Sequence, residues 1–117
     1  MRSGNNMENV EIFKFAGEDL AVGDPVYFNG EYWMKAKADK EETYCTDIVR
    51  VPSLAFNLCP VLLTGFVQNE NWNFKEGSTL YLSAESAGVI TDIKPETEKV
   101  QSVGYAVSNN KIFFSIA

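Results

Sequence analysis

The sequence predicts an all-β fold: a small single-domain β-barrel or β-sandwich built of short antiparallel strands and hairpins. Short apolar and aromatic runs recur along nearly the whole chain, and turn residues separate them. No window of helix length keeps an apolar i, i+3, i+4, i+7 face free of Gly, Pro or β-branched residues. The chain has 117 residues, of which 45% are hydrophobic, which is enough for one domain with a core.

Residues 1–9 are expected to form a flexible polar N-terminal arm, and residues 10–117 a single β domain. The turn sequences "NGE" at 29–31 and "NN" at 109–110 tolerate positive φ and predict hairpins over 25–36 and 100–116. Pro52 and Pro60 interrupt the most apolar segment, so a loop or edge crossing is expected before a buried strand begins at Val61. Strands are expected at 10–15, 25–28, 32–36, 47–51, 61–68, 79–83, 88–91, 100–108 and 111–116, with a charged loop at 92–101.

Two segments of the sequence resemble each other. "LAVGDPVYF" (20–28) and "FKEGSTLYL" (74–82) share an apolar anchor, a Gly turn and an apolar–Tyr–apolar strand start. Gly23 and Gly77 are expected to hold equivalent turns, and replacing either with Val to cost roughly 1–3 kcal/mol of stability. Asp24 and Ser78 are expected to cap freed backbone N–H groups. Gly88 fixes a third turn, after which Val89 and Ile90 are expected, with Leu80 and Leu82, to supply core contacts.

The charge pattern argues against nucleic-acid binding and membrane insertion. The net charge is −6, and the longest basic grouping is the thin "MKAKADK" at 34–40, which fits a solvated strand edge. No apolar run approaches the length of a membrane span. The N-terminal sequence has one Arg and no apolar segment, so we expect no secretory signal.

The residue types do not support an enzyme, a metal site or a cofactor. The chain has no His, and its two cysteines, Cys45 and Cys59, are expected to be buried small hydrophobes rather than a disulfide. No phosphate-binding Gly-rich motif and no calcium-loop spacing is present. Carboxylate pairs remain, and each is expected to lie in a solvated turn; the pairs are Glu18–Asp19, Glu41–Glu42 and Glu96–Glu98.

Aromatic residues carry the strongest functional signal. Adjacent pairs such as Tyr32–Trp33 and Phe113–Phe114 place one ring on each face of a strand, so one ring is either exposed or covered by a partner, unless both faces are buried within one sandwich. A second cluster is "NENWN" at 69–73, where a Trp lies among Asn residues that could hydrogen-bond a sugar. The candidate partner or ligand surface is therefore Tyr32, Trp33, Asn69, Asn71, Trp72 and Asn73.

Three segments together resemble a family of bacteriophage virion accessory proteins. They are "AGEDLAVGDPVYFNGEYWMKA" (16–36), "GFVQNENWNFKEGSTLYLSAESAGVITD" (65–92) and "KVQSVGYAVSNNKIFFS" (99–115). The family comprises capsid decoration proteins, head-fibre proteins and tail-fibre tips. Residues 43–57 depart from its pattern. The resemblance implies a small β-barrel or sandwich, usually a homotrimer, that attaches to a virion and carries no catalytic residues.

Two functions follow as expectations. The first is a structural virion protein, made in the host bacterial cytoplasm, which docks as an oligomer on the major capsid protein or another virion protein. The polar N-terminal arm would be the docking segment. The second is a fibre-tip module that binds a bacterial surface glycan or protein through Trp33 or Trp72. The short chain favours the first function, because a tip normally ends a long fibre.

Overall fold

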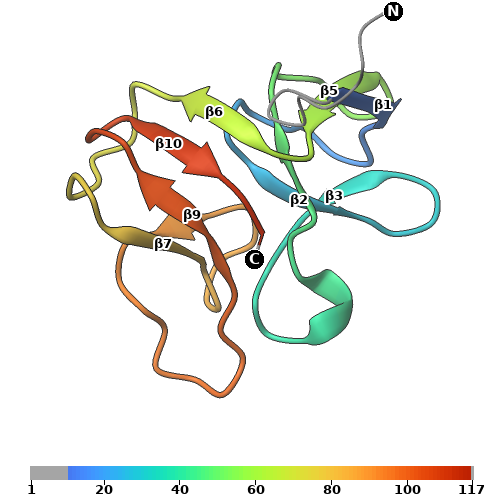
Figure 1. The fold of residues 1–117 in the computed structure, drawn as a ribbon. Coiled ribbons are helices and arrows are strands. Elements are labelled where there is room, and N and C mark those ends of the chain that lie inside the picture. Colours follow the sequence, from blue (N-terminus) through green and yellow to red (C-terminus); the bar gives the residue numbers. More distant parts are fainter. Residues whose placement is uncertain (1–10, 117) are drawn as a thin grey trace, which may run out of the picture.

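The computed structural model describes residues 11–116 and shows an all-β, sandwich-like fold of two five-stranded antiparallel sheets, neither closed into a barrel (Figure 1). The expected N-terminal arm lies outside the described residues. Within them there is no α-helix, only one 3₁₀ turn at Glu41–Thr43. The strands are β1 Glu11–Phe15, β2 Pro25–Phe28, β3 Trp33–Lys35, β4 Asp47–Val49, β5 Leu58–Leu62, β6 Gly65–Gln68, β7 Thr79–Leu82, β8 Ile90–Thr91, β9 Ser102–Ala106 and β10 Lys111–Phe114.

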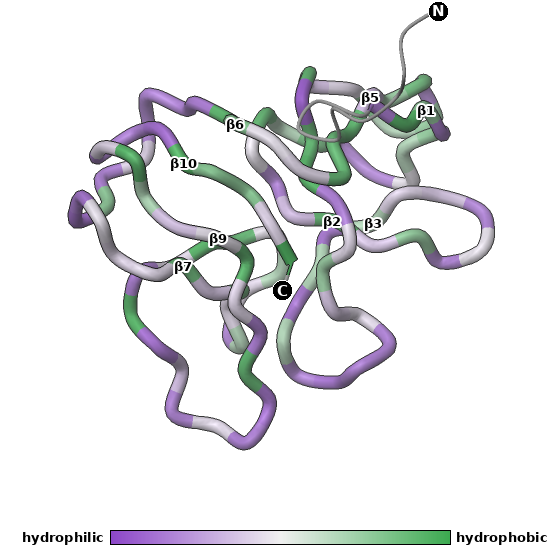
Figure 2. The backbone as a smooth tube through the Cα atoms, in the orientation of Figure 1, coloured by the Kyte–Doolittle hydropathy of each residue, from purple (hydrophilic) through white to green (hydrophobic). Residues whose placement is uncertain are grey.

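The expected strands and hairpins are largely present. The hairpins β2–β3 and β9–β10 form as the turn sequences predict. Residues 92–101 form the charged loop, and the tube in Figure 2 is mainly hydrophilic there, whereas hydrophobic segments follow the strands. Val89 is exposed, contrary to expectation, because it points away from the core on the opposite side from its neighbour Ile90.

Two expectations about the apolar segment are wrong. Residues 61–68 are not one strand. The strand is interrupted at Leu63–Thr64, where the chain passes from the first sheet to the second. Pro60 lies within β5, which is a central strand between β1 and β4. Its carbonyl accepts a hydrogen bond from the N–H of Arg50 at 3.0 Å, just beyond the end of β4. The missing proline N–H faces this same place, so the proline removes a hydrogen bond just beyond the end of β4 and not within its ladder.

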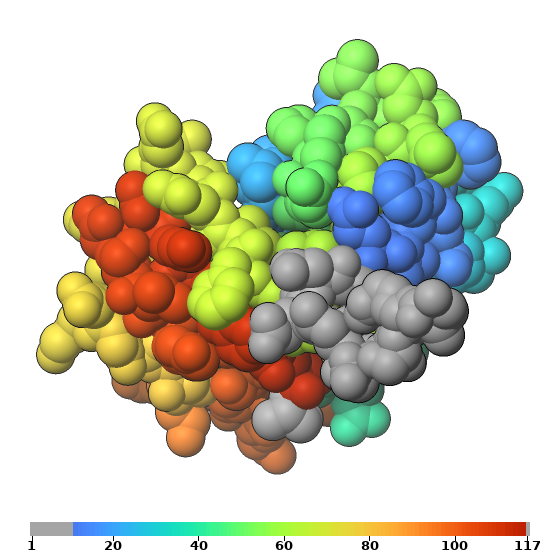
Figure 3. Space-filling model, turned by 45° about the horizontal axis from the view of Figure 1, so that its top comes forward, coloured from blue at the N-terminus to red at the C-terminus, as the bar shows by residue number. Residues whose placement is uncertain are grey.

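The two sheets have the same topology. The first sheet has the order β1-β5-β4-β2-β3 and the second has β6-β10-β9-β7-β8, so each strand of one corresponds to the strand five later in the other. The pairing registers also correspond: Val49↔Val61 matches Ala106↔Ile112. The chain therefore contains an internal structural repeat, in which the first half (residues 11–62) and the second half (residues 65–114) have the same fold. Figure 3 shows the two halves as adjacent bodies, coloured blue to green and yellow to red.

The short sequence echo marks the same turn in each half. Gly23 has φ 86° and Gly77 has φ 83°. The N–H of Gly23 donates to Val49 at 2.9 Å, and the N–H of Gly77 donates to Ala106 at 2.8 Å, the matching residue. Asp24 accepts the N–H of Ala21 through its carboxylate at 2.9 Å. Ser78 instead donates its hydroxyl to the carbonyl of Lys75 at 2.6 Å.

The two turn glycines have different surroundings. Comparing substitutions at the two positions therefore separates the cost of backbone strain from the cost of disturbed packing. A Cβ on Gly23 would lie 2.4 Å from the ring of Trp72, whereas a Cβ on Gly77 would meet nothing within 4 Å. We expect Gly77→Ala to lower the free energy of unfolding by about 1 kcal/mol through positive-φ strain alone. Gly23→Ala should cost about 2 kcal/mol or more, because the ring must also move. Urea titration of both variants measures the difference, and equal losses would contradict the Trp72 contact.

Each half buries equivalent positions. The first half has its own cluster of buried side chains, here called the smaller cluster: Ala16, Leu20, Val26, Trp33, Val49, Cys59 and Val61, with Ile12 packed against it. Their counterparts in the second half belong to a larger cluster. The matched pairs are Leu20 with Phe74, Val26 with Leu80, Trp33 with Ile90, Val49 with Ala106, Val61 with Ile112 and Ile12 with Val67.

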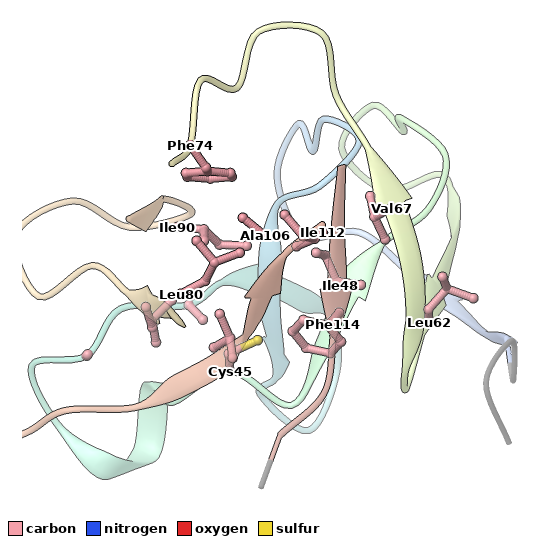
Figure 4. Packing of buried hydrophobic residues seen from close by; sticks show 14 residues of the cluster. Cys45, Ile48, Leu62, Val67, Phe74, Leu80, Ile90, Ala106, Ile112 and Phe114 are labelled. Atoms are coloured by element: carbon pink, nitrogen blue, oxygen red, sulfur yellow. The ribbon is translucent and has the colours of Figure 1, made fainter. Parts of the chain in front are cut away.

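The larger cluster also joins the two halves. Besides the second half's own residues it contains five from the first half: Ala36, Ala38, Cys45, Ile48 and Leu62. Figure 4 shows Cys45 and Ile48 among Ile112 and Phe114 of the second half. Hydrogen bonds reinforce the junction, because the Gln101 side chain donates to the Cys45 carbonyl at 2.7 Å and accepts the Cys45 N–H at 2.8 Å. Both cysteines are buried and free, as the sequence predicts.

Candidate functional site

The "NENWN" loop holds the two halves together rather than presenting a sugar platform. The Asn69 amide donates to the carbonyl of Val22 at 2.9 Å, and its side-chain oxygen accepts the N–H of Asn71 at 2.8 Å. The half-buried Trp72 packs against the larger cluster and over Gly23. Of the five residues, Glu70, Asn71 and Asn73 are exposed, whereas Asn69 and Trp72 are half-buried.

The other predicted pair, Tyr32–Trp33, divides between surface and core. Trp33 is buried in the smaller cluster, so its ring offers no stacking face to a ligand. Tyr32 is half-buried and contacts Phe56 edge-on, with 5.5 Å between ring centroids. Because Trp33 and Trp72 belong to different clusters, the structure does not bring the six candidate residues together on one surface.

A different aromatic surface lies on the outer face of the second sheet. Phe66, Phe113 and Tyr105 are direct cross-strand neighbours on β6, β10 and β9, and we call these three residues the aromatic row. Ring centroids are 4.9 Å apart for Phe66–Phe113 and 5.7 Å for Tyr105–Phe113. Phe66 is 46% exposed and Tyr105 is 47% exposed. The Lys111 ammonium lies 5.2 Å from the Phe66 centroid at the edge of the row.

The sequence contains one indication of this aromatic row, although none of its three residues is among the candidate surface residues predicted above. Phe113 and Phe114 are adjacent, so one of them has to point out of the second sheet. In the structure Phe114 is fully buried and Phe113 takes the outer face. Tyr105 could be added only with the register of the predicted 100–116 hairpin, and Phe66 only with the pairing of β6, because it lies far from Phe113 in sequence.

A second apolar surface lies on the first sheet, where Phe13, Phe15 and Leu58 are all about half exposed. Phe15 and Leu58 are cross-strand partners on β1 and β5.

The Glu18–Asp19 carboxylate pair serves structure. Glu18 accepts the N–H of Lys35, and Asp19 accepts the N–H of Ala55, both at 2.9 Å, so this carboxylate pair fixes backbone from two distant segments. Within residues 11–116 no group of three or more His, Cys, Asp or Glu side chains comes together to hold a metal ion. In the same residues no helix is long and apolar enough to cross a membrane.

A groove of about 550 Å³ runs between the loops at 83–89 and 91–97. The hydroxyl of Ser83 accepts the N–H groups of Glu85 and Ser86 at 3.1 and 3.0 Å, so it is already used to shape one wall. Ser86, Lys94 and Glu96 also line the groove, but within residues 11–116 no hydrogen bond joins a serine hydroxyl to a basic side chain there, so we assign it no chemistry.

Asp47 is the one buried carboxylate of the described residues, and one of its oxygens has no partner. The other oxygen accepts the hydroxyl of Thr46 at 2.6 Å. Burial raises the pKa of Asp47 above its ordinary 3.8, while the Thr46 bond and the charge of Lys14 oppose that rise.

This raised pKa predicts a pH dependence of stability. A carboxylate with a higher pKa in the folded state binds more protons when folded, so its contribution grows as the pH falls from 7 toward 3.8 and is lost as pH rises through the folded pKa. The melting temperature should therefore gain less between pH 7 and pH 4 in Asp47→Asn than in the wild-type chain. The exposed Glu70→Gln removes one charge at the surface as a control. A pH profile of Asp47→Asn that matches the wild type would contradict this account.

Comparisons with known proteins add no identification. A scan against protein-family models gives no match, and a search of curated protein sequences gives none either.

Proposed function

We propose that the chain is a non-enzymatic structural protein of a phage virion, a capsid decoration or head-fibre module that docks as an oligomer. The observation that carries this proposal is the aromatic row of Phe66, Phe113 and Tyr105, which places three neighbouring rings on the outer face of the second sheet. Clustered, half-exposed aromatic rings are typical of protein–protein contacts, and monomeric proteins tend to avoid such patches. The motif resemblance over residues 16–115 gives the proposal its virion context.

The alternative, a fibre tip that binds a host surface glycan, has less support. A sugar platform needs a ring with a free face beside hydrogen-bonding groups. Trp33 is in the core, and Trp72 and Asn69 are engaged at the junction between the halves. The polar neighbour described for the aromatic row is Lys111, whose ammonium lies beside Phe66 at the edge of the row. This composition is better suited to a protein partner than to a sugar ring.

The experiment is immunogold labelling of purified phage particles from the strain that produces the chain, with antibodies raised against the recombinant protein. We expect gold at regular positions over the capsid. Pre-incubation of the antibody with recombinant protein is the control and should abolish the label. Label confined to fibre ends would replace the proposal with the fibre-tip alternative, and purified particles without label would overturn both.

A further inference from the structure

We infer that the aromatic row of one copy packs, head to tail, against the surface around Phe28 and Leu63 of a second copy of this chain. The inference rests on the oligomer of the proposed function but not on attachment to a virion. Its basis is the internal repeat: the chain already contains one contact of this type, between its own two halves.

The first step concerns the face that carries the row. Phe113, Tyr105 and Thr79 on the second sheet correspond by register to Leu62, Ile48 and Pro25 on the first. In the first half these positions are buried, because Ile48 and Leu62 enter the larger cluster with the second half. Within residues 11–116 no equivalent element covers this face of the second half, where Tyr105 is 47% exposed and Phe113 is half-buried.

The second step concerns what covers such a face. The second half contributes Leu82 and Phe114 to the larger cluster, and both are fully buried there. Their counterparts in the first half are Phe28, which pairs with Trp33 as Leu82 pairs with Ile90, and Leu63, which follows Leu62 as Phe114 follows Phe113. Phe28 is 38% exposed and Leu63 is 39% exposed. The first half therefore carries an equivalent of the covering surface that is partly open, with the Lys14 ammonium 4.9 Å from the Phe28 ring centroid.

Each copy thus keeps two uncovered surfaces, the aromatic row and the surface around Phe28 and Leu63. Between two copies, these surfaces can form the same type of contact that joins the two halves within one chain. Leu82 is fully buried, whereas its counterpart Phe28 is 38% exposed. An open hollow of about 400 Å³, lined by Tyr27, Phe28, Asn29, Lys40, Glu42 and Thr43, adjoins it and can receive a projecting side chain.

A contact between two different surfaces is heterologous, so it closes into a ring or continues as a filament. Closure with three copies would give the homotrimer that the motif resemblance implies. In such a ring every copy uses its aromatic row once and its Phe28–Leu63 surface once. An isologous dimer, in which the aromatic row meets itself, is the competing arrangement.

The test measures molar mass by light scattering after size exclusion for the wild-type chain, Tyr105→Glu and Leu63→Glu. We expect a trimer mass for the wild type and a monomer mass for each variant at the same concentration. An equimolar mixture of the two variants should form a dimer, because it retains one intact aromatic row facing one intact Phe28–Leu63 surface. Ile93→Glu is the matched control, since Ile93 is highly exposed on a different loop, and it should keep the trimer mass.

Circular dichroism melting checks that each variant folds, and Leu63→Gln replaces Leu63→Glu if the latter does not. A trimer mass retained in both variants would overturn the assignment of the surfaces while leaving the proposed oligomer intact. A mixture that does not associate would overturn the head-to-tail arrangement. A monomeric wild type would overturn both this inference and the oligomer of the proposed function. If deleting residues 1–9 then restores association, the N-terminal segment is the occupant.

Discussion

Replacing Phe114 with alanine is expected to lower the free energy of unfolding by about 3–5 kcal/mol. Phe114 is the largest fully buried side chain, and it lies in the larger cluster where the two halves meet. Truncation removes the apolar contacts of a whole ring and leaves a cavity between the two sheets. The sheets are closely packed, so they cannot shift far enough to fill it. Urea unfolding followed by circular dichroism at one fixed protein concentration gives the loss, because the proposed self-association would make stability depend on concentration.

Phe13→Ala is the matched control, since it removes the same atoms from a ring that is more than half exposed. It should cost less than about 1 kcal/mol, as surface substitutions usually do. Similar losses for the two variants would mean that Phe114 does not join the halves as described.

Gly104→Ala is expected to cost about 3 kcal/mol or more and to reduce the amount of folded protein. Gly104 has φ 140°, a conformation that L side chains rarely adopt. An added Cβ would overlap the carbonyl oxygen of Phe113 on the neighbouring strand, and backbone cannot swing aside as a side chain can. Gly104 lies beside the register shift between Leu80 and Tyr81, where the β7–β9 ladder gains an extra residue and Val103 turns into the core.

Gly30→Ala controls for positive φ alone. Gly30 has φ 101° and nothing within 4 Å of the added Cβ, so it should lose about 1 kcal/mol. Thermal melting of both variants compares them, and a Gly104→Ala chain as stable as Gly30→Ala would show that the sheet relaxes around the bulge.

Local chemistry explains what the sequence predicts correctly. Gly23 and Gly77 can be recognised because positive φ favours Gly, and the "NGE" and "NN" turns because Asn and Gly tolerate it. The extent of the repeat is hidden, because equivalent positions carry different side chains. Leu20 matches Phe74, and Pro25 matches Thr79, and each residue fits the neighbours of its own half.

The candidate partner surface predicted from the sequence depends on which aromatic ring of each adjacent pair faces outward. The alternation of side chains along a strand does not determine which of the two rings that is. Tyr32 lies just before β3 and Trp33 begins it, and only the position of the smaller cluster makes Trp33 the buried one. Pro60 was excluded from a central strand on a sound general rule. The rule fails here because β4 is only three residues long, and its length depends on the tertiary structure.

The internal junction also has a consequence for synthesis on the ribosome. The first half emerges first, and its Ile48 and Leu62 stay without cover until β7, β9 and β10 have followed. At about 5–20 residues per second this interval lasts several seconds, during which the nascent chain presents apolar surface to chaperones and to other nascent chains. A fragment that stops at Thr64 should therefore bind the dye ANS strongly and aggregate, whereas the finished chain should do neither; a fragment that stays dispersed and binds no dye would show that the first half covers these side chains by itself.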